Sequence, residues 1–132
     1  MPASTAHRGA LLHFLDDSAR RKVGAFEYWP DGLLWLEDGR VKTAGPAAKL
    51  LKRLPRGLKV ERHPDALIVP GFVDCHVHFS QTEVIAAYGE QLLEWLARHV
   101  FPVEARFKDP AHAREVASVF LKELLRNGTT TA

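Results

Sequence analysis

The character of the sequence changes at Leu67-Ile68-Val69-Pro70-Gly71-Phe72-Val73-Asp74-Cys75-His76-Val77-His78. Apolar residues outnumber polar ones there until two histidines close the run. A continuous apolar segment is typical of a strand buried on both faces, as in a parallel barrel. Residues two apart on a strand point to the same face, so His76 and His78 are expected to project their imidazoles side by side. Cys75 is expected to face the other way and to serve in packing.

Two neutral imidazole nitrogens on one face can bind one metal ion. Zinc binds imidazole nitrogen at about 2.0–2.1 Å, and a catalytic zinc usually has three protein ligands and a water. The two histidines alone therefore do not complete a zinc site, and two imidazoles suit several other divalent ions as well. The spacing also leaves open a chance pair, with one ring in a core and the other in solvent.

The chain divides into a β-rich segment, residues 1–66, and a second segment, residues 67–132. In the first, apolar stretches alternate with turn signals and predict short strands at 10–15, 26–29, 33–36 and 58–62. Asp38-Gly39 predicts a β-hairpin leading into a strand at 41–44. Residues 47–54 have a short helical pattern, which Pro55 and Gly57 end.

The second segment predicts an α/β arrangement. After the histidine strand, a helix is expected around 92–96, ending near Phe101-Pro102. A clearer helix begins at Asp109-Pro110, where a good N-cap precedes a proline in the first turn, and Asn127-Gly128 ends it. The β-branched residues 129–131 predict the start of another strand. The order is one βα unit and an incomplete second one.

Composition and charge indicate which kinds of partner the protein binds. The net charge is +2, with Lys and Arg mixed among Asp and Glu, which favours neither a nucleic-acid surface nor a membrane surface. No apolar run approaches the roughly 18 residues that span a bilayer. Cys75 is the single cysteine, and the first residues lack the pattern of a secretory signal. We therefore predict a cytoplasmic protein that acts on a small molecule.

The residues from Pro70 to His78 resemble the Pro-Gly-aliphatic-aliphatic-Asp-x-His-x-His signature of the amidohydrolase superfamily. Within that superfamily, the chain is similar to the guanine deaminases. The similar stretches are Phe79-Ser80-Gln81-Thr82, Tyr88-Gly89-Glu90-Gln91 with the residues up to Leu96, Phe101-Pro102-x-Glu104, and residues 126–131. This resemblance runs from about Leu67 to Ala132 and is looser in the N-terminal half.

The resemblance implies a (β/α)₈ metal-dependent hydrolase barrel preceded by a small composite β-sandwich. The barrel is incomplete in this chain, because a whole one needs about 250 residues. The resemblance also implies that His76 and His78 bind one Zn²⁺, and that Gln81, with Ser80 beside it, contacts a purine. Asp74 would accept the free N–H of a ligating imidazole. Read without the family, Asp74 could instead bind neighbouring backbone N–H groups, and Gln81 could be a solvated loop residue.

No catalytic role is assigned to Glu90, Glu94 or Glu104, and the proton-transfer groups and the other metal ligands are expected beyond Ala132. The remaining histidines are predicted to be surface or packing residues, because none has a partner at ligand spacing in the sequence. They are His7, His13, His63, His99 and His112.

The reaction implied by the resemblance is hydrolysis of guanine to xanthine and ammonia by a metal-activated water, in a homodimeric enzyme. One alternative is a related amidohydrolase that acts on a cyclic amide or a triazine. Another is a non-catalytic interaction module. The 132-residue chain alone is expected to be inactive and poorly folded beyond its β-rich segment, because a first barrel strand by itself exposes apolar faces and unpaired edges.

Overall fold

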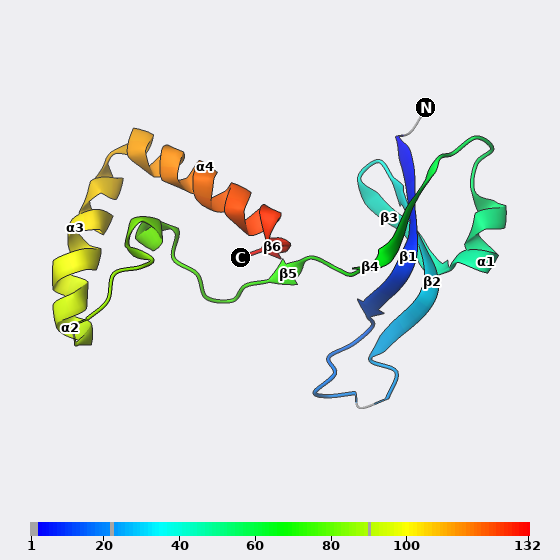
Figure 1. Ribbon diagram of the computed structural model, residues 1–132, viewed down its shortest axis with the longest axis horizontal. Helices are drawn as coiled ribbons and strands as arrows, with labels where there is room; N and C mark the ends of the chain where they lie inside the picture. Colours follow the sequence, from blue (N-terminus) through cyan, green and yellow to red (C-terminus); the bar gives the residue numbers. More distant parts are fainter. Residues whose placement is uncertain (1–2, 22, 90) are drawn as a thin grey trace. The chain divides into compact units, whose positions relative to one another are not determined.

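A computed structural model describes residues 3–21, 23–89 and 91–132 of the chain. The chain forms two compact units, Met1–Pro70 and Gly71–Ala132 (Figure 1). Glu90, which belongs to one of the stretches that resemble guanine deaminases, lies outside the described residues.

The first unit is built on a four-stranded sheet with the order β3-β2-β1-β4. Its strands are β1 (Ser4–Phe14), β2 (Phe26–Glu37), β3 (Arg40–Pro46) and β4 (Val60–Ile68). β1 pairs antiparallel with β2 and parallel with β4, while β3 pairs antiparallel with β2. Figure 1 shows β1 between β2 and β4.

The predicted break within residues 26–36 is wrong, because β2 is one strand of 12 residues. The pairing with β1 shifts register between Gly9 and Leu11, so that Pro30 and Asp31 lie in an irregularity of the ladder. A bulge of this kind accommodates proline, which has no N–H to donate to a partner strand. The strand therefore continues through a turn-like sequence.

The predicted hairpin and short helix are both confirmed. Asp38 and Gly39 join β2 to β3 with φ angles of 51° and 73°, the pair of positive values that a tight hairpin turn requires. The helix consists of α1 (Ala47–Leu50) and the 3₁₀ turn η1 (Leu51–Arg53). The core of the unit lies between this helix and the sheet, where four residues are buried together: Ala6, Leu33, Ala47 and Leu50.

The prediction of one buried strand over 67–78 is wrong. Leu67 and Ile68 complete β4 in the first sheet, β5 comprises only Phe72–Val73, and residues 74–78 are irregular. Phe72 is 60% exposed and Val73 65% exposed. Pro70 cannot donate to a ladder, which favours the break. A parallel strand is buried only where other elements cover both of its faces, and the described residues supply β5 with β6 (Thr129–Thr131) alone as a partner strand.

In the second unit, helices connect β5 to β6, and the two strands pair in parallel. The mixed α/β content and the predicted strand at 129–131 are thus confirmed. The last helix, α4 (Pro110–Arg126), begins as predicted, because the Asp109 carboxylate accepts a hydrogen bond from the Ala111 backbone N–H at 2.9 Å. It ends at Asn127 and at Gly128, whose φ is +83°.

The preceding helical stretch runs further than predicted. It comprises α2 (Leu92–Trp95), the π turn η3 (Leu96–Val100), α3 (Phe101–Glu104) and the 3₁₀ turn η4 (Ala105–Lys108). Pro102 therefore does not end the helix. A proline cannot donate to the carbonyl four residues before it and crowds that carbonyl, and the wider π turn just ahead of Pro102 accommodates both effects. No helix in the described ranges combines the length and apolar character that crossing a bilayer requires.

Candidate functional site

The imidazoles of His76 and His78 converge. Their Nε2 atoms lie 2.8 Å apart, and the ring planes meet at 54°. At that distance one ring carries the proton and donates it to the other. Two nitrogens bound to a tetrahedral zinc lie about 3.4 Å apart, given Zn–N distances of about 2.1 Å. A small opening of the pair would therefore admit an ion, and the donor set fits a divalent metal.

The two rings were predicted to lie side by side because alternate residues of a strand share one face. They do lie together, but a turn at residues 74–78 brings them there, and no strand includes them. Asp74 shapes that turn, because its Oδ1 accepts a hydrogen bond from the backbone N–H of His76 at 3.0 Å. The backbone N–H of Asp74 in turn donates to the Thr131 carbonyl at 2.9 Å, which ties the turn to β6. The Asp74 carboxylate thus binds a neighbouring backbone N–H, which is one of the two roles predicted for it. Its contact with an imidazole N–H stays a prediction.

Ser80 and Gln81 lie in η2 (Phe79–Val84), directly after the second histidine. The Gln81 backbone N–H donates to the His78 carbonyl at 3.1 Å, which closes a tight turn. Both side chains reach one atom of α3, since Ser80 Oγ and Gln81 Nε2 donate to Glu104 Oε1 at 2.9 and 3.1 Å. Gln81 is therefore half-buried and held, unlike a solvated loop residue.

Glu104 acts as a charged anchor. Hydrogen bonds from Gln81 and, to a smaller extent, from Ser80 lower its pKa below the ordinary value of 4.5, while desolvation opposes the shift. The Coulombic attraction of His78, which acts where that imidazole is protonated, lowers the pKa of Glu104 as well, as the smallest cause. An ionised carboxylate only accepts hydrogen bonds, so the nitrogen end of the Gln81 amide must face it. No side-chain hydrogen bond from the described residues reaches the carbonyl oxygen or the second N–H of that amide, so both could meet a ligand.

The position of Glu104 in this cluster could not be predicted from the sequence. It lies 23 residues from Gln81, and no local periodicity connects positions so far apart. The sequence feature that includes Glu104 is Phe101-Pro102-x-Glu104, which resembles the guanine deaminases but indicates no contact with Gln81.

One pocket of about 370 Å³ contains both histidines and Gln81 in its lining. Val84, Trp95 and Phe120 contribute apolar and aromatic walls. The indole of Trp95 is held in place, since its Nε1 donates to the Ala87 carbonyl at 3.0 Å. Small-molecule sites are typically hollows of about 300–1,000 Å³ with apolar walls and a few placed polar groups. This pocket has that character, and it adds two convergent metal-ligand nitrogens.

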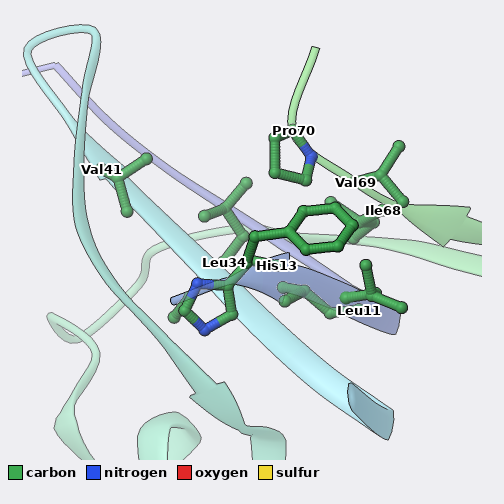
Figure 2. A pocket seen from close by; sticks show the side chains of 10 residues that line it. Leu11, His13, Leu34, Val41, Ile68, Val69 and Pro70 are labelled. Carbon is green, nitrogen blue, oxygen red and sulfur yellow. The ribbon is translucent and has the colours of Figure 1, made fainter. Parts of the chain in front are cut away.

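A second pocket, of about 330 Å³, lies in the first unit (Figure 2). Its lining is almost wholly aliphatic or aromatic and includes Leu11, Leu34, Ile68 and Pro70. Figure 2 shows a single imidazole, that of His13, among these side chains. Its Nε2 lies 3.1 Å from Glu27 Oε2. The pocket offers one titratable group and no convergent set of polar atoms, so it is a weaker candidate for chemistry.

Comparison with known proteins gives a consistent result. Residues 67–132 match the family model described as the amidohydrolase family. The chain is 46% identical over 116 residues to guanine deaminase of Escherichia coli strain K12, an alignment that covers 88% of this chain and 26% of that protein. The chain therefore spans about a quarter of the length of that curated relative.

Solved structures of guanine deaminases are similar to this chain as well. The structure titled E. coli guanine deaminase matches with a TM-score of 0.83 at 42% identity, covering 96% of this chain and 30% of that one. A guanine deaminase from C. acetobutylicum, with guanine bound in its active site, matches with a TM-score of 0.73 at 26% identity. That match covers 97% of this chain and 29% of the other.

Proposed function

Because this chain belongs to the amidohydrolase family, we propose that the whole protein is a guanine deaminase, which hydrolyses guanine to xanthine and ammonia. The observation that carries the proposal is the shared pocket of His76, His78 and Gln81. It combines metal-ligand nitrogens with an amide that can both donate to and accept from a base edge. The relatives named guanine deaminase support the same substrate.

His76 Nε2 and His78 Nε2 would hold the ion, which we propose to be one Zn²⁺. A bound zinc would lower the pKa of its water toward about 7 and so supply hydroxide near neutral pH. Two imidazoles bind such an ion only as neutral rings, each offering a free nitrogen. The remaining ligands and the proton-transfer groups would come from other parts of the whole protein.

Gln81 would recognise the purine, and Glu104 would act as its positioning residue. The carboxylate holds the nitrogen end of the amide, so the amide oxygen is directed to accept from an N–H of the bound base. Ser80 shares the same carboxylate oxygen and keeps it from turning toward the base. This arrangement favours a ligand that offers an N–H donor beside an acceptor, as guanine does.

The architecture that would complete this site is a (β/α)₈ barrel, with β5 and β6 as its first two strands. They pair in parallel through a helical connection, as consecutive barrel strands do. His76 and His78 follow the C-terminal end of β5, which is the end where active sites of such barrels lie. We propose that the first unit contributes to the composite β-sandwich that precedes the barrel.

The direct test is guanine turnover by the whole protein, followed as xanthine formation. His76→Ala should abolish turnover and lower the bound zinc, whereas the matched variant His13→Ala in the first unit should leave both unchanged. Full turnover in His76→Ala would overturn the proposal. Hydrolysis of a cyclic amide or a triazine, with guanine left intact, would replace it with the related activity.

We also propose a cytoplasmic enzyme that acts as a homodimer. Cys75 is exposed and unbonded, as suits a reducing compartment. Cell fractionation tests the compartment. Light scattering on the whole protein tests the dimer, since a monomeric mass at working concentration would contradict it.

A further inference from the structure

A second cluster of metal-ligand atoms lies on the sheet of the first unit. His7 on β1 is the register partner of Glu61 on the parallel strand β4, and His63 is two residues further along β4. His7 Nδ1 lies 3.2 Å from His63 Nε2 and 3.6 Å from Glu61 Oε2. His63 Nε2 lies 3.8 Å from Glu61 Oε1. Within the described residues, this is the one group of three such side chains whose ligand atoms all lie within 4.8 Å of one another.

The backbone is shaped to bring the two imidazoles together. Gly9 is the register partner of His63, and a Cβ at Gly9 would lie 2.7 Å from the His63 carbonyl oxygen and 3.3 Å from its Cβ. Any side chain at Gly9 would therefore push His63 away. The pairing then jumps from Gly9↔His63 to Ala10↔Leu67, so the ladder is interrupted just after the histidine. Pro64 lies in that interruption, where its missing N–H costs no ladder bond.

The histidines are also held before any ion arrives. Their rings stack with centroids 5.4 Å apart and planes at 27°. The side chains of His7 and His63 are 27% and 31% exposed, whereas that of Glu61 is 62% exposed. Two ligands are thus largely ordered and the third can adjust to the ion. Such partial preorganisation lowers the entropy that binding must overcome.

We propose that His7, His63 and Glu61 bind a divalent transition-metal ion, Zn²⁺ in the first instance, at a site in the first unit distinct from the proposed deaminase centre. Two imidazoles and a carboxylate form a donor set that zinc accepts. The two imidazole nitrogens lie 3.2 Å apart, and each lies near a different oxygen of Glu61, at 3.6 and 3.8 Å, close to the roughly 3.4 Å expected between ligands of a tetrahedral zinc. Mg²⁺ and Ca²⁺ are disfavoured, because they require oxygen ligands.

The fourth position would be open to water. A pocket of about 460 Å³ includes His7 and Glu61 in its lining, along with Thr5 and Lys59. The ion would bridge β1 and β4, joining residues that lie 56 positions apart in the sequence. A ligand that binds the folded state alone stabilises it. We therefore expect Zn²⁺ to raise the unfolding temperature of the first unit.

The same atoms could serve only as a histidine–histidine hydrogen bond beside a carboxylate, with no ion bound. Metal titration distinguishes this purely structural role from a metal site. The whole protein is titrated with Zn²⁺ against a chromophoric chelator, with bound metal counted per chain. His7→Ala and His63→Ala should each lose one zinc equivalent, or bind it roughly tenfold or more weakly. Guanine turnover should stay unchanged in both variants, because these residues lie outside the proposed deaminase centre.

His13→Ala is the matched control, because His13 also lies on β1 and pairs with a carboxylate, Glu27, at 3.1 Å. It belongs to no three-ligand group among the described residues. This variant should keep the full number of zinc equivalents and the zinc-induced rise in unfolding temperature. His63→Gln has a side chain of similar size and should fold like the parent, so a loss of zinc in this variant would not be due to misfolding. Equal zinc binding by the parent, His7→Ala and His63→Gln would overturn the proposal.

The choice of metal gives a second, independent measurement. A site of two imidazoles and a carboxylate should follow the Irving–Williams order, with Cu²⁺ bound more tightly than Zn²⁺. Co²⁺ should produce tetrahedral absorption bands in the parent that are absent from His7→Ala. A cluster in which Mg²⁺ competes as well as Zn²⁺ would be an acidic surface patch and not this site.

Discussion

Two histidine pairs in this protein make nearly the same contact and arise in opposite ways. His76 and His78 are two positions apart, and a turn brings their Nε2 atoms to 2.8 Å. His7 and His63 are 56 positions apart, and a strand pairing brings their ring nitrogens to 3.2 Å. The first pair can be found by reading along the chain. The second exists only because β1 and β4 are neighbours.

Their surroundings differ as well. The pair at 76 and 78 shares a pocket with Gln81, whose amide is anchored by Glu104. The pair at 7 and 63 has a carboxylate within ligand distance, and no such amide belongs to its three-ligand cluster. The first arrangement is suited to an ion that works on a substrate, and the second to an ion that is simply held.

The largest expected effect is on catalysis. If the proposed function holds, His78→Ala in the whole protein should reduce guanine turnover by about a thousandfold or more, because it would remove a proposed ligand of the ion that activates water. His63→Ala should leave turnover within about twofold. Steady-state xanthine formation at saturating guanine is the measurement. A comparable loss in His63→Ala would show that the two pairs are not functionally separate.

The next effect is on the stability of the sheet that presents His7. Leu33 is fully buried, at 0% exposure, so Leu33→Ala should cost about 2–5 kcal/mol of unfolding free energy. Leu15→Ala, at a side chain that is 52% exposed, is the control and should cost much less. Hydrogen exchange should quicken in β1 and β2 and remain unchanged in α4. Equal quickening in α4 would mean that the two units do not respond separately.

A smaller effect is expected at the proposed purine contact. Glu104→Gln removes the charge that orients the Gln81 amide, so kcat/KM for guanine should fall by roughly 10- to 100-fold, chiefly through KM. Bound zinc should not change. Gln81→Ala should give a similar loss, and the double variant should lose little more than either single one. Glu94→Gln, at an exposed position of α2, is the control and should match the parent.

The smallest effect concerns an ion pair in the first unit, between Arg8 of β1 and Asp31 of β2. Arg8 forms two hydrogen bonds to Asp31, at 2.7 and 2.8 Å, and these lower the pKa of Asp31 below its ordinary value of 3.8. The contribution of Asp31 to stability is therefore present above that value and is lost as pH falls through the lowered pKa. The Asp31 side chain is 55% exposed, so solvent screens the pair and the gain is slight.

Asp31→Asn should accordingly reduce the unfolding midpoint slightly at neutral pH and leave it unchanged in strong acid. Thermal unfolding at both pH values, with and without added salt, is the measurement. Salt should narrow the difference between parent and variant, because it screens surface charges. A difference that persists in strong acid would show that the carboxylate acts through packing.

Some structural features follow from residues that are close in sequence. Asp38-Gly39 forms the hairpin turn because both residues tolerate positive φ, and Asp109 caps α4 through the N–H of Ala111. Other features do not follow in this way. β2 continues past Pro30 because a bulge opposite Ala10 accommodates it, and the helix at 92–108 passes Pro102 because a π turn precedes it. In each of these cases, a neighbouring turn or strand compensates for the proline.

The α/β order, the hairpin, the start and end of α4, and the family resemblance of residues 67–132 could be predicted from the order of residues, since these features depend on side chains within a few positions of one another. Three features could be found only in the folded chain: Glu104 anchors Gln81, β5 is short and exposed, and His7 meets His63 and Glu61. Those outcomes depend on which strands and helices become neighbours. Spatial proximity between distant positions is set by packing and leaves no periodic trace along the chain.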